Sequence, residues 1–497
     1  MADNLRMESA TTSRGLLDRT LRRFRRAWRG AGLGSAELRD VVAPDVSAAD
    51  SNHLRQQFQA CLEARSGEIE ARTRAAALGA TYLSLNETGK RRFVDILADD
   101  FAIDETAIAA AIDAYKNATG TNSTADADPD PEAGAQGMEV RHRALQQLRD
   151  ALIAPRVRLL TRFNELSLGV KFLVDMRADI LRMKDRSLQL VELERDLKTL
   201  LLSWFDIGFL DLTRITWNSP AAVLEKLIEY EAVHAIRSWD DLKDRLEDDR
   251  RCYAFFHPCM PDEPLIFVEV ALVDGLTGNI HELLDPSRTP RAVDAADTAI
   301  FYSISNCQSG LAGVSFGNFL IKRVASDLAR DLPGVKTFST LSPIPGFRRW
   351  LSDHLDQPDP NLELSEAHRS SLSDHGSSPE EVIAAVLASP GMLVEAEHAK
   401  LAETLAPIIR SLCARYLLTA KRGQRARDRV AHFHLSNGAR VERLNWLGDR
   451  SAPGLDGSLG MMVNYRYVLS DVDKNHEAYV ANGKVVATTQ VQKTVKG

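Results

Sequence analysis

A short glycine-containing loop, inside the stretch from residue 299 to residue 332, has the residue types that most clearly suggest chemistry. The stretch reads AIFYSISNCQSGLAGVSFGNFLIKRVASDLARDL. Its start predicts a strand that ends near Ser305, and three glycines then precede an amphipathic helix with apolar residues at Leu320, Val324 and Leu328. A loop that enters a helix exposes backbone N–H groups and the positive end of the helix dipole, which suits a phosphate or pyrophosphate. The glycine spacing fits neither a dinucleotide fingerprint nor a P-loop, so a purely structural turn stays open as the alternative.

Ser342 stands at the start of a rigid turn in the segment FSTLSPIPGFRRW, residues 338–350. Two prolines and a glycine fix this turn directly after a predicted strand. Because α/β folds place their sites at the carboxyl ends of strands, Ser342 is a candidate polar group of a functional site. A capping serine is the alternative interpretation.

Two histidines lie close together in the segment RVAHFHLSNGARVERLNW, residues 429–446. The pattern predicts strands over 430–435 and 439–444, joined by a hairpin at Asn437-Gly438. On a strand, His432 and His434 would point to the same face. They could be a metal pair that needs a further ligand, histidines without a chemical role, or a catalytic acid or base.

The elements that must position these residues fall into two parts. Helical periodicity dominates before Trp204, with a break at Asn117–Gln136, where Asp, Thr, Pro and Gly predict a mobile loop. Pro155 is expected to separate two helices. The predicted domains are therefore an N-terminal, partly helical extension (1–51), a helical domain (52–203) and a catalytic domain (204–497).

Strands and helices alternate after Trp204. Strands are expected at 252–256, 265–273 and 299–305, and helices at 318–332, 380–387 and 397–418. This alternation indicates an α/β or α+β domain.

Composition limits the classes of function. The chain has 497 residues and a formal net charge of −7, which argues for several domains and against a general nucleic-acid binder. Five scattered cysteines without metal spacing suggest reduced thiols. No apolar run approaches the length of a membrane span, and the Arg-rich N-terminus is interrupted by acidic residues, which favours a solvated helix over a transit peptide. We therefore expect a cytoplasmic protein that does not bind membranes.

Four long blocks after Trp204 read AIFYSISNCQSGLAGVSFGNFLIKRV, FSTLSPIPGFRRWL, HFHLSNGARVERLNW and GLDGSLGMMVNYRYVL, and HPCMPDEPLIFVEVAL precedes them. In this order they resemble the malonyl-CoA decarboxylase family. The resemblance extends, more loosely, to the helical part before them. It implies an α+β multidomain protein in which an N-terminal all-α helical domain is followed by a GNAT-like α/β catalytic domain. The glycine loop itself resembles the GNAT pyrophosphate loop, Q/R-x-x-G-x-G/A, with Ala312 and Ser315 in place of the usual first and fourth residues and Gly317 matching the last.

The resemblance also implies a set of site residues. The family's catalytic serine and histidine match Ser342 and His434. Its acyl-CoA loop, to which malonyl-CoA would bind, matches Ala312, Gly313, Val314, Ser315, Phe316, Gly317, Asn318 and, one turn on, Ile321. Ser315 stands where animal members commonly have an acidic residue. Tyr465 and Tyr467 match as supporting residues.

The implied reaction converts malonyl-CoA to acetyl-CoA and CO2 without a metal or organic cofactor. Loss of CO2 leaves an enolate on the thioester, and we hypothesise that His434 then protonates the carbon while Ser342 hydrogen-bonds His434 or orients the carboxylate.

Two other functions fit the same fold: a GNAT-type acyl-CoA acyltransferase and a non-catalytic acyl-CoA sensor. The acyltransferase would need an amine site and a carboxylate base, and neither stands out. The expected partners are malonyl-CoA and acetyl-CoA, with a dimer or tetramer formed through the helical domain. A basic run from Lys421 to Arg429 could meet the adenosine phosphates of CoA or could be a solvated loop.

Overall fold

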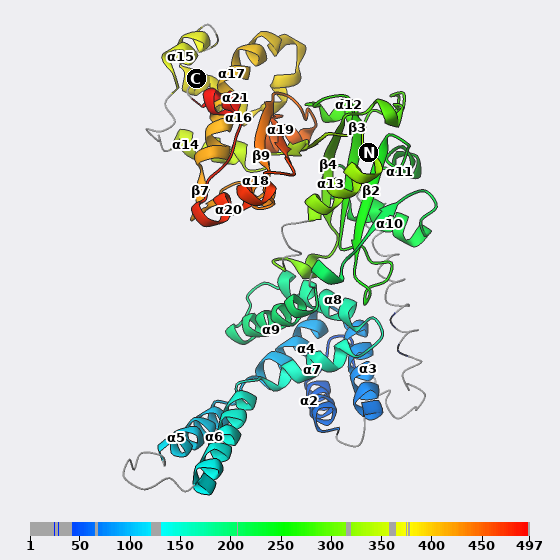
Figure 1. The fold of residues 1–497 in the computed structure, drawn as a ribbon, viewed down its shortest axis with the longest axis vertical. Coiled ribbons are helices and arrows are strands. Elements are labelled where there is room, and N and C mark those ends of the chain that lie inside the picture. Colours follow the sequence, from blue (N-terminus) through cyan, green and yellow to red (C-terminus); the bar gives the residue numbers. More distant parts are fainter. Residues whose placement is uncertain are drawn as a thin grey trace. The chain divides into compact units, whose positions relative to one another are not determined.

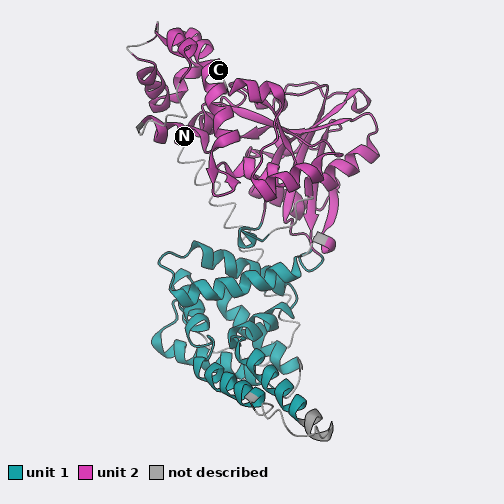
Figure 2. Cartoon of the chain, turned by 60° about the vertical axis from the view of Figure 1, so that its left-hand side comes forward, with its two compact units in different colours: residues 1–206, 258–261, 308–314 teal, residues 207–257, 262–307, 315–497 magenta. Residues whose placement is uncertain are grey.

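The computed structural model describes residues 24, 28, 42–64, 68–120, 131–205, 207–314, 320–356, 364–373, 375 and 378–495. The chain divides into two compact units (Figure 2). Unit 1 comprises residues 1–206, 258–261 and 308–314, and unit 2 comprises residues 207–257, 262–307 and 315–497. The predicted domain limits at residues 52 and 204 stay a prediction, and most of the predicted N-terminal extension lies outside the described residues.

The described part of unit 1 is built from helices (Figure 1), which are α2 (Ala48–Glu63), α3 (Glu68–Ser84), α4 (Glu87–Asp99), α5 (Glu105–Gly120), α6 (Pro131–Ala151), α7 (Pro155–Asn164), α8 (Gly169–Arg182) and α9 (Leu188–Trp204). Helix α7 begins at Pro155, so the predicted break there is confirmed; a proline at the first helical position costs no hydrogen bond. The core contains tightly packed aromatic rings, and the Tyr82 ring lies edge-on to Phe93 and to Phe172, with centroids 5.0 and 5.6 Å away.

The predicted loop over 117–136 is partly wrong. Helix α5 continues to Gly120, helix α6 already starts at Pro131, and residues 121–130 are outside the described part of the chain. The two helices pack against each other and bury small residues, including Ala118 and Ala144. Packing between helices outweighs the weak local helix preference of the polar residues there.

Unit 2 contains a mixed eight-stranded sheet in the order β1-β2-β3-β4-β5-β10-β6, with β9 on the other side of β10. The strands are β1 (Asp211–Ile215), β2 (Arg250–Phe256), β3 (Ile266–Val273), β4 (Thr298–Asn306), β5 (Thr337–Thr340), β6 (Ser342–Pro343), β9 (Arg440–Asn445) and β10 (Met462–Arg466). Neighbouring strands are antiparallel except β4 and β5, which are parallel. The first three predicted strands are confirmed as β2, β3 and β4, and all residues of β3 are buried.

The helices of unit 2 are α10 (Ala221–Tyr230), α11 (Trp239–Asp244), α12 (Ile280–Leu283), α13 (Leu320–Asp331), α14 (Phe347–Asp356), α15 (Glu366–Leu372), α16 (Pro379–Ala388), α17 (Ala399–Thr419), α18 (Arg429–Ser436), α19 (Ala452–Ser458), α20 (Val472–Asn482) and α21 (Thr489–Thr494). Strands β7 (Lys421–Arg422) and β8 (Arg425–Ala426) form a separate ribbon. A helical region followed by a mixed-sheet domain confirms the predicted α+β class, whereas the likeness of that domain to acetyltransferases stays a prediction. Among the described residues, no helix combines the length and apolar character that a membrane crossing requires.

The predicted strand over 430–435 is wrong, because these residues form helix α18. The Asp428 carboxylate accepts hydrogen bonds from the backbone N–H groups of Val430 and Ala431, both at 2.9 Å, and so caps the helix start. Gly438 has φ +80° just past the helix end, and a side chain there would collide with the Val472 carbonyl. Asn437-Gly438 therefore ends a helix instead of turning a hairpin. The following strand is confirmed as β9.

Candidate functional site

Ser342 lies at the point where the chain leaves β5. The backbone N–H of Leu341 still donates to the Phe301 carbonyl of β4 at 3.0 Å, and Ser342 then pairs with Val463 of β10. Gly346 permits close packing of the following turn, because a Cβ there would lie 2.4 Å from the Tyr416 hydroxyl. The turn that the sequence predicted thus holds a buried serine in a fixed place.

His434 of α18 meets this serine. The Ser342 hydroxyl oxygen is 3.1 Å from His434 Nε2, and His434 Nδ1 is 2.8 Å from the Tyr467 hydroxyl. The Ser342 hydroxyl donates to Thr340 Oγ1 at 2.8 Å. With that proton committed, Nε2–H donates to Ser342 and Nδ1 accepts from Tyr467, so every hydrogen bond in the row has one donor.

Burial holds the imidazole uncharged. His434 is 3% exposed, and desolvation lowers its pKa to about 3. The ring of Tyr465 stacks on it with centroids 4.7 Å apart, and burial raises the pKa of Tyr467 well above its usual value. At neutral pH the pair is therefore a neutral donor and acceptor, enclosed by aromatic rings.

His432 does not share this environment. Its Nδ1 lies 2.8 Å from the Tyr479 hydroxyl, whereas His434 points to Ser342 and Tyr467. The expectation of a common strand face is wrong, because residues two apart on a helix point in different directions. Among the described residues, the group with metal-ligand spacing is Glu395, Glu397 and His398, which includes neither His432 nor His434.

The predicted acyl-CoA loop is described only in part. Ala312, Gly313 and Val314 belong to unit 1, where the Arg177 guanidinium donates to the carbonyls of Gly310 and Ala312. Ser315, Phe316, Gly317 and Asn318 lie outside the described residues. Ile321 is fully buried on α13 of unit 2.

Asn464, which sequence reasoning missed, is a buried amide that hydrogen-bonds Thr340, the residue to which Ser342 donates. Asn464 of β10 donates from Nδ2 to the Thr340 carbonyl at 2.7 Å, and its Oδ1 accepts from Asn445 and Arg443. The backbone N–H of Tyr465 donates to Thr340 Oγ1 at 3.1 Å. Asn464 sits inside the NYRY segment, but nothing local to the sequence shows which amide will be enclosed.

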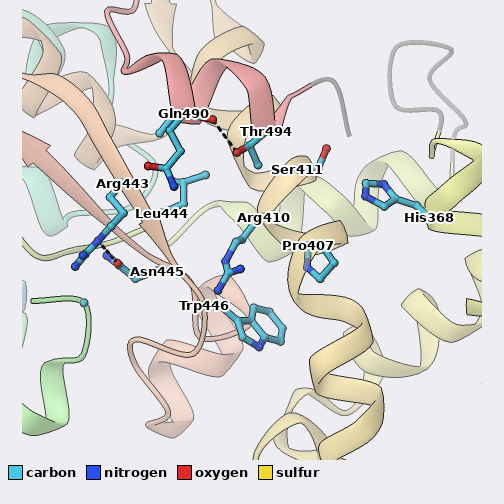
Figure 3. Close-up of a pocket in the computed structure, with 12 residues that line it drawn as sticks. His368, Pro407, Arg410, Ser411, Arg443, Leu444, Asn445, Trp446, Gln490 and Thr494 are labelled. Carbon is cyan, nitrogen blue, oxygen red and sulfur yellow. Dashed lines mark hydrogen bonds between the residues drawn. The ribbon is translucent and has the colours of Figure 1, made fainter. Parts of the chain in front are cut away.

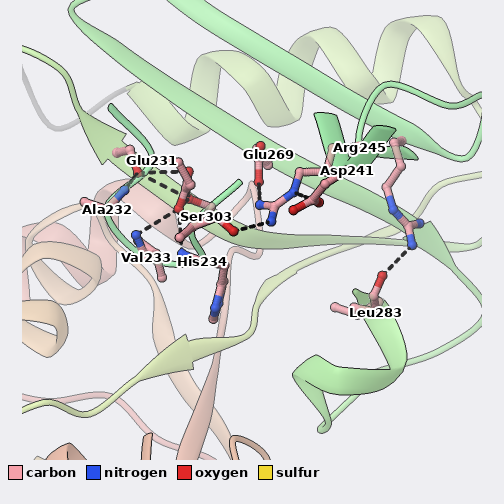
Figure 4. Close-up of polar contacts among 12 residues, drawn as sticks. Glu231, Ala232, Val233, His234, Asp241, Arg245, Glu269, Leu283 and Ser303 are labelled. Carbon is pink, nitrogen blue, oxygen red and sulfur yellow. Dashed lines mark hydrogen bonds and ion pairs between the residues drawn. The ribbon is translucent and has the colours of Figure 1, made fainter. Parts of the chain in front are cut away.

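A second buried polar centre, also missed, joins β3 and β4 to the ends of α10 and α11 (Figure 4). Glu269 of β3 pairs with Arg245 at 3.0 Å, and Arg245 also pairs with Asp241 at 2.9 Å. Nearby, the Glu231 carboxylate accepts from the Ser303 hydroxyl, at 2.7 Å for one of its oxygens. Burial raises the pKa of Glu269 to about 7, and the charge of Arg245 opposes that rise.

Comparison with known proteins identifies the family of the chain. The family model described as malonyl-CoA decarboxylase C-terminal domain matches residues 208–497, and that described as its N-terminal domain matches residues 101–205. Malonyl-CoA decarboxylase, mitochondrial, of Anser anser anser is 35% identical over 504 residues, which cover 95% of this chain and 93% of the relative. The protein of that name from Rattus norvegicus is 41% identical over 367 residues, 70% of this chain and 72% of the relative.

Solved structures give the same result. The crystal structure of malonyl-CoA decarboxylase from Rhodopseudomonas palustris is 42% identical, with a TM-score of 0.77 over 89% of this chain and 99% of that chain. The enzyme from Agrobacterium vitis is 40% identical, with a TM-score of 0.76 and the same coverage.

A helical region, a mixed sheet and these relatives define the class as a carboxy-lyase. The chain belongs to the malonyl-CoA decarboxylase family.

Proposed function

We propose that this chain converts malonyl-CoA to acetyl-CoA and CO2, with Ser342 and His434 at the reacting end of the substrate. The observation that carries the proposal is the buried, uncharged Ser342–His434 pair, in a chain of this family. The likeness of Ala312, Gly313, Val314, Ser315, Phe316, Gly317, Asn318 and Ile321 to the family's acyl-CoA loop supports placing the CoA thioester there.

The chemistry needs one proton and a place for negative charge. When the bond between C2 and the carboxylate breaks, CO2 leaves. The electron pair of that bond stays on the thioester fragment and forms an enolate. Donors aimed at the thioester oxygen stabilise that enolate, typically by about 10²–10³ in rate for each donor. C2 must then take up one proton to give acetyl-CoA.

His434 suits the protonation step. The malonyl carboxylate next to the imidazole would raise the pKa of His434, so that the histidine takes a proton from solvent as substrate binds. The added proton is on Nδ1, which then donates to the Tyr467 hydroxyl oxygen, while Nε2–H faces Ser342 and the substrate. After CO2 has left, Nε2–H protonates C2, and the imidazole is again neutral with its proton on Nδ1.

The direct test is incubation of purified protein with malonyl-CoA in EDTA, with acetyl-CoA followed by mass spectrometry. We expect acetyl-CoA to appear without any amine acceptor. Unchanged malonyl-CoA would instead favour an acyltransferase or an acyl-CoA sensor on the same fold.

We also propose that the protein self-associates through its helical unit. Several large apolar side chains of that unit are exposed, among them Ile69, Met138 and Leu188, each more than 70% accessible. Light scattering of the purified protein should give a dimer or tetramer mass; a monomer at micromolar concentration would contradict this.

A cytoplasmic location is the last part of the proposal. Its support is that all five cysteines are free of disulfides and four of them are buried. The names of the goose and rat relatives include "mitochondrial", so fractionation of the source cells is the test.

A further inference from the structure

A cavity of about 650 Å³ in unit 2 lies between α17, α21, α15 and β9 (Figure 3). Arg410 of α17 projects into it, with Trp446 close by, and Arg443 of β9 forms part of its wall. Gln490 and Ser411 add polar groups. The volume is that of an ordinary small-molecule site.

The charged side chains that line this cavity are positive. Among the described residues that line the cavity, two are arginines and none is Asp or Glu, in a chain whose net charge is −7. Arg410 is half-buried and forms no hydrogen bond or ion pair with any described residue. Burial lowers the pKa of Arg443, which Glu442 only partly offsets.

A larger cavity of about 790 Å³ in the same unit has a different lining. It is lined by both signs of charge, and three of its four arginines are ion-paired, Arg245 with Asp241 and both Arg250 and Arg288 with Asp249. Paired guanidinium groups have their charge satisfied within the protein. Arg410 is left with donors that a ligand can use.

The wall of the smaller cavity is hydrogen-bonded to the support of Ser342. Arg443 Nε donates to Asn445 Oδ1 at 2.9 Å and to Asn464 Oδ1 at 3.2 Å. Asn464 donates to the Thr340 carbonyl, and Thr340 Oγ1 accepts from the Ser342 hydroxyl. Arg443 is thus connected to Ser342 by hydrogen bonds through Asn464 and through the backbone and side chain of Thr340, and a ligand that moves Arg443 acts on one end of this connection.

We propose that this cavity binds a small anion with at least two negative charges, a phosphate ester or a polycarboxylate, and that the bound anion changes turnover through Arg443 and Asn464. The guanidinium of Arg410 would pair with the negative charge of the ligand, and the indole ring of Trp446 would pack against the rest of the ligand.

Binding is tested by calorimetry on the full chain with inorganic pyrophosphate and with citrate, against sodium chloride at equal ionic strength. We expect saturable binding, tighter for pyrophosphate if the ligand is a phosphate ester and tighter for citrate if it is a polycarboxylate. Arg410→Gln should weaken binding about tenfold or more, because a charge-assisted contact is lost. Arg349→Gln, on an exposed arginine outside the cavity, is the matched control and should leave binding unchanged. Absence of saturable binding, or equal weakening by both variants, overturns the proposal.

Kinetics separate this site from the substrate site. The KM for malonyl-CoA should be the same in Arg410→Gln and in the unaltered chain, and CoA should not displace pyrophosphate or citrate. Displacement by CoA would make the cavity part of the substrate site and overturn the proposal. Because the binding heat does not depend on turnover, failure of this site is distinguishable from failure of the decarboxylation.

The link to Ser342 has its own variant. Arg443→Lys keeps the charge but removes the Nε donor shared by the two asparagines, so a change in kcat on saturation with the anion, at least twofold in the unaltered chain, should shrink. Arg440→Lys on the same strand is the control and should keep that change. A kcat that does not respond to the anion in the unaltered chain refutes the link.

Discussion

Unit 2 contains two buried polar centres, the Ser342–His434 pair and the cluster around Arg245. The cluster contains a charged arginine, whereas the pair is uncharged. Arg245 faces two carboxylates, at 2.9 and 3.0 Å, so its charge is met within the protein. His434 contacts a serine, a tyrosine hydroxyl and aromatic rings, and burial keeps it neutral.

The difference separates stability from chemistry. A centre whose charges are already paired has nothing left to offer a substrate, and removing one partner leaves the other buried and unpaired. At neutral pH, a buried histidine without a counter-charge gains a proton when an anionic ligand binds beside it. We therefore expect substitutions in the first pair to change turnover and substitutions in the second cluster to change folding.

The largest expected effect is on turnover. His434→Asn removes the proton donor and should lower kcat by about 10³-fold, within the range usual for general acids. Equilibrium binding of CoA should be unchanged. Steady-state assays and calorimetry measure the two quantities, and turnover equal to that of the unaltered chain would remove His434 from the mechanism.

The converse change concerns stability. Arg245→Met leaves Glu269 buried without its cation and should lower the free energy of unfolding by about 3–5 kcal/mol at pH 8. The loss should be smaller at pH 6, because Glu269 can then be protonated; without Arg245 its pKa rises above the present value of about 7. Urea denaturation at both pH values measures this. Lys243→Met on the exposed side of α11 is the control, and an equal loss there would contradict the assignment.

A smaller effect distinguishes the two histidines of α18. Tyr467→Phe removes the hydroxyl on His434 Nδ1 and should lower kcat about tenfold, since the ring loses one oriented hydrogen bond. Tyr479→Phe removes the matching hydroxyl on His432 and should leave kcat unchanged. The test is a measurement of kcat for both folded variants. Equal decreases would contradict a role of the Tyr467–His434 hydrogen bond in turnover.

The last comparison concerns the pH dependence of stability. Burial lowers the pKa of His434 to about 3 and that of His234 to about 4, so below pH 6.5 each imidazole binds a proton in the unfolded chain but not in the folded one. Glu269 has the opposite sign, because its raised pKa favours the proton in the folded chain, and it offsets one of the two histidines. Stability should therefore fall as pH drops from 6.5 towards 4, by up to about 1.4 kcal/mol per pH unit for each histidine. Urea denaturation at pH 7.5, 6 and 5 should show a shallower fall in His434→Asn. His142→Asn on the exposed face of α6 should not change the slope, and no difference between these variants would refute the burial argument.

The position of Ser342 before a rigid turn could be predicted, because the signals that determine this turn are local in the sequence. A strand, two prolines and a glycine determine the turn within a few residues. The element around His434 was misread because its apolar pattern over 430–435 is too short to separate a strand from a helix. Asp428 and Gly438, as helix cap and helix end, settle the outcome, and the Asn-Gly pair was assigned to the wrong turn.

The other polar centres could not be predicted, because their partners are far apart in the chain. Glu231 and Ser303 are separated by 72 positions, and Asn464 reaches Thr340 across 124. No local pattern encodes such pairs, since only the tertiary fold decides which amides and carboxylates are enclosed together.

The clamp of Arg177 on the carbonyls of Gly310 and Ala312 has a consequence for synthesis on the ribosome. Unit 1 is discontinuous, and its last segment, residues 308–314, is translated only after strands β1 to β4. Arg177 is almost fully buried in the complete protein. Before those carbonyls have been translated, Glu194 is its remaining partner among these contacts. Unit 1 therefore cannot be completed before a large part of unit 2 has been translated, and a nascent chain stalled before residue 308 should be more sensitive to protease near α8 than one stalled after residue 314.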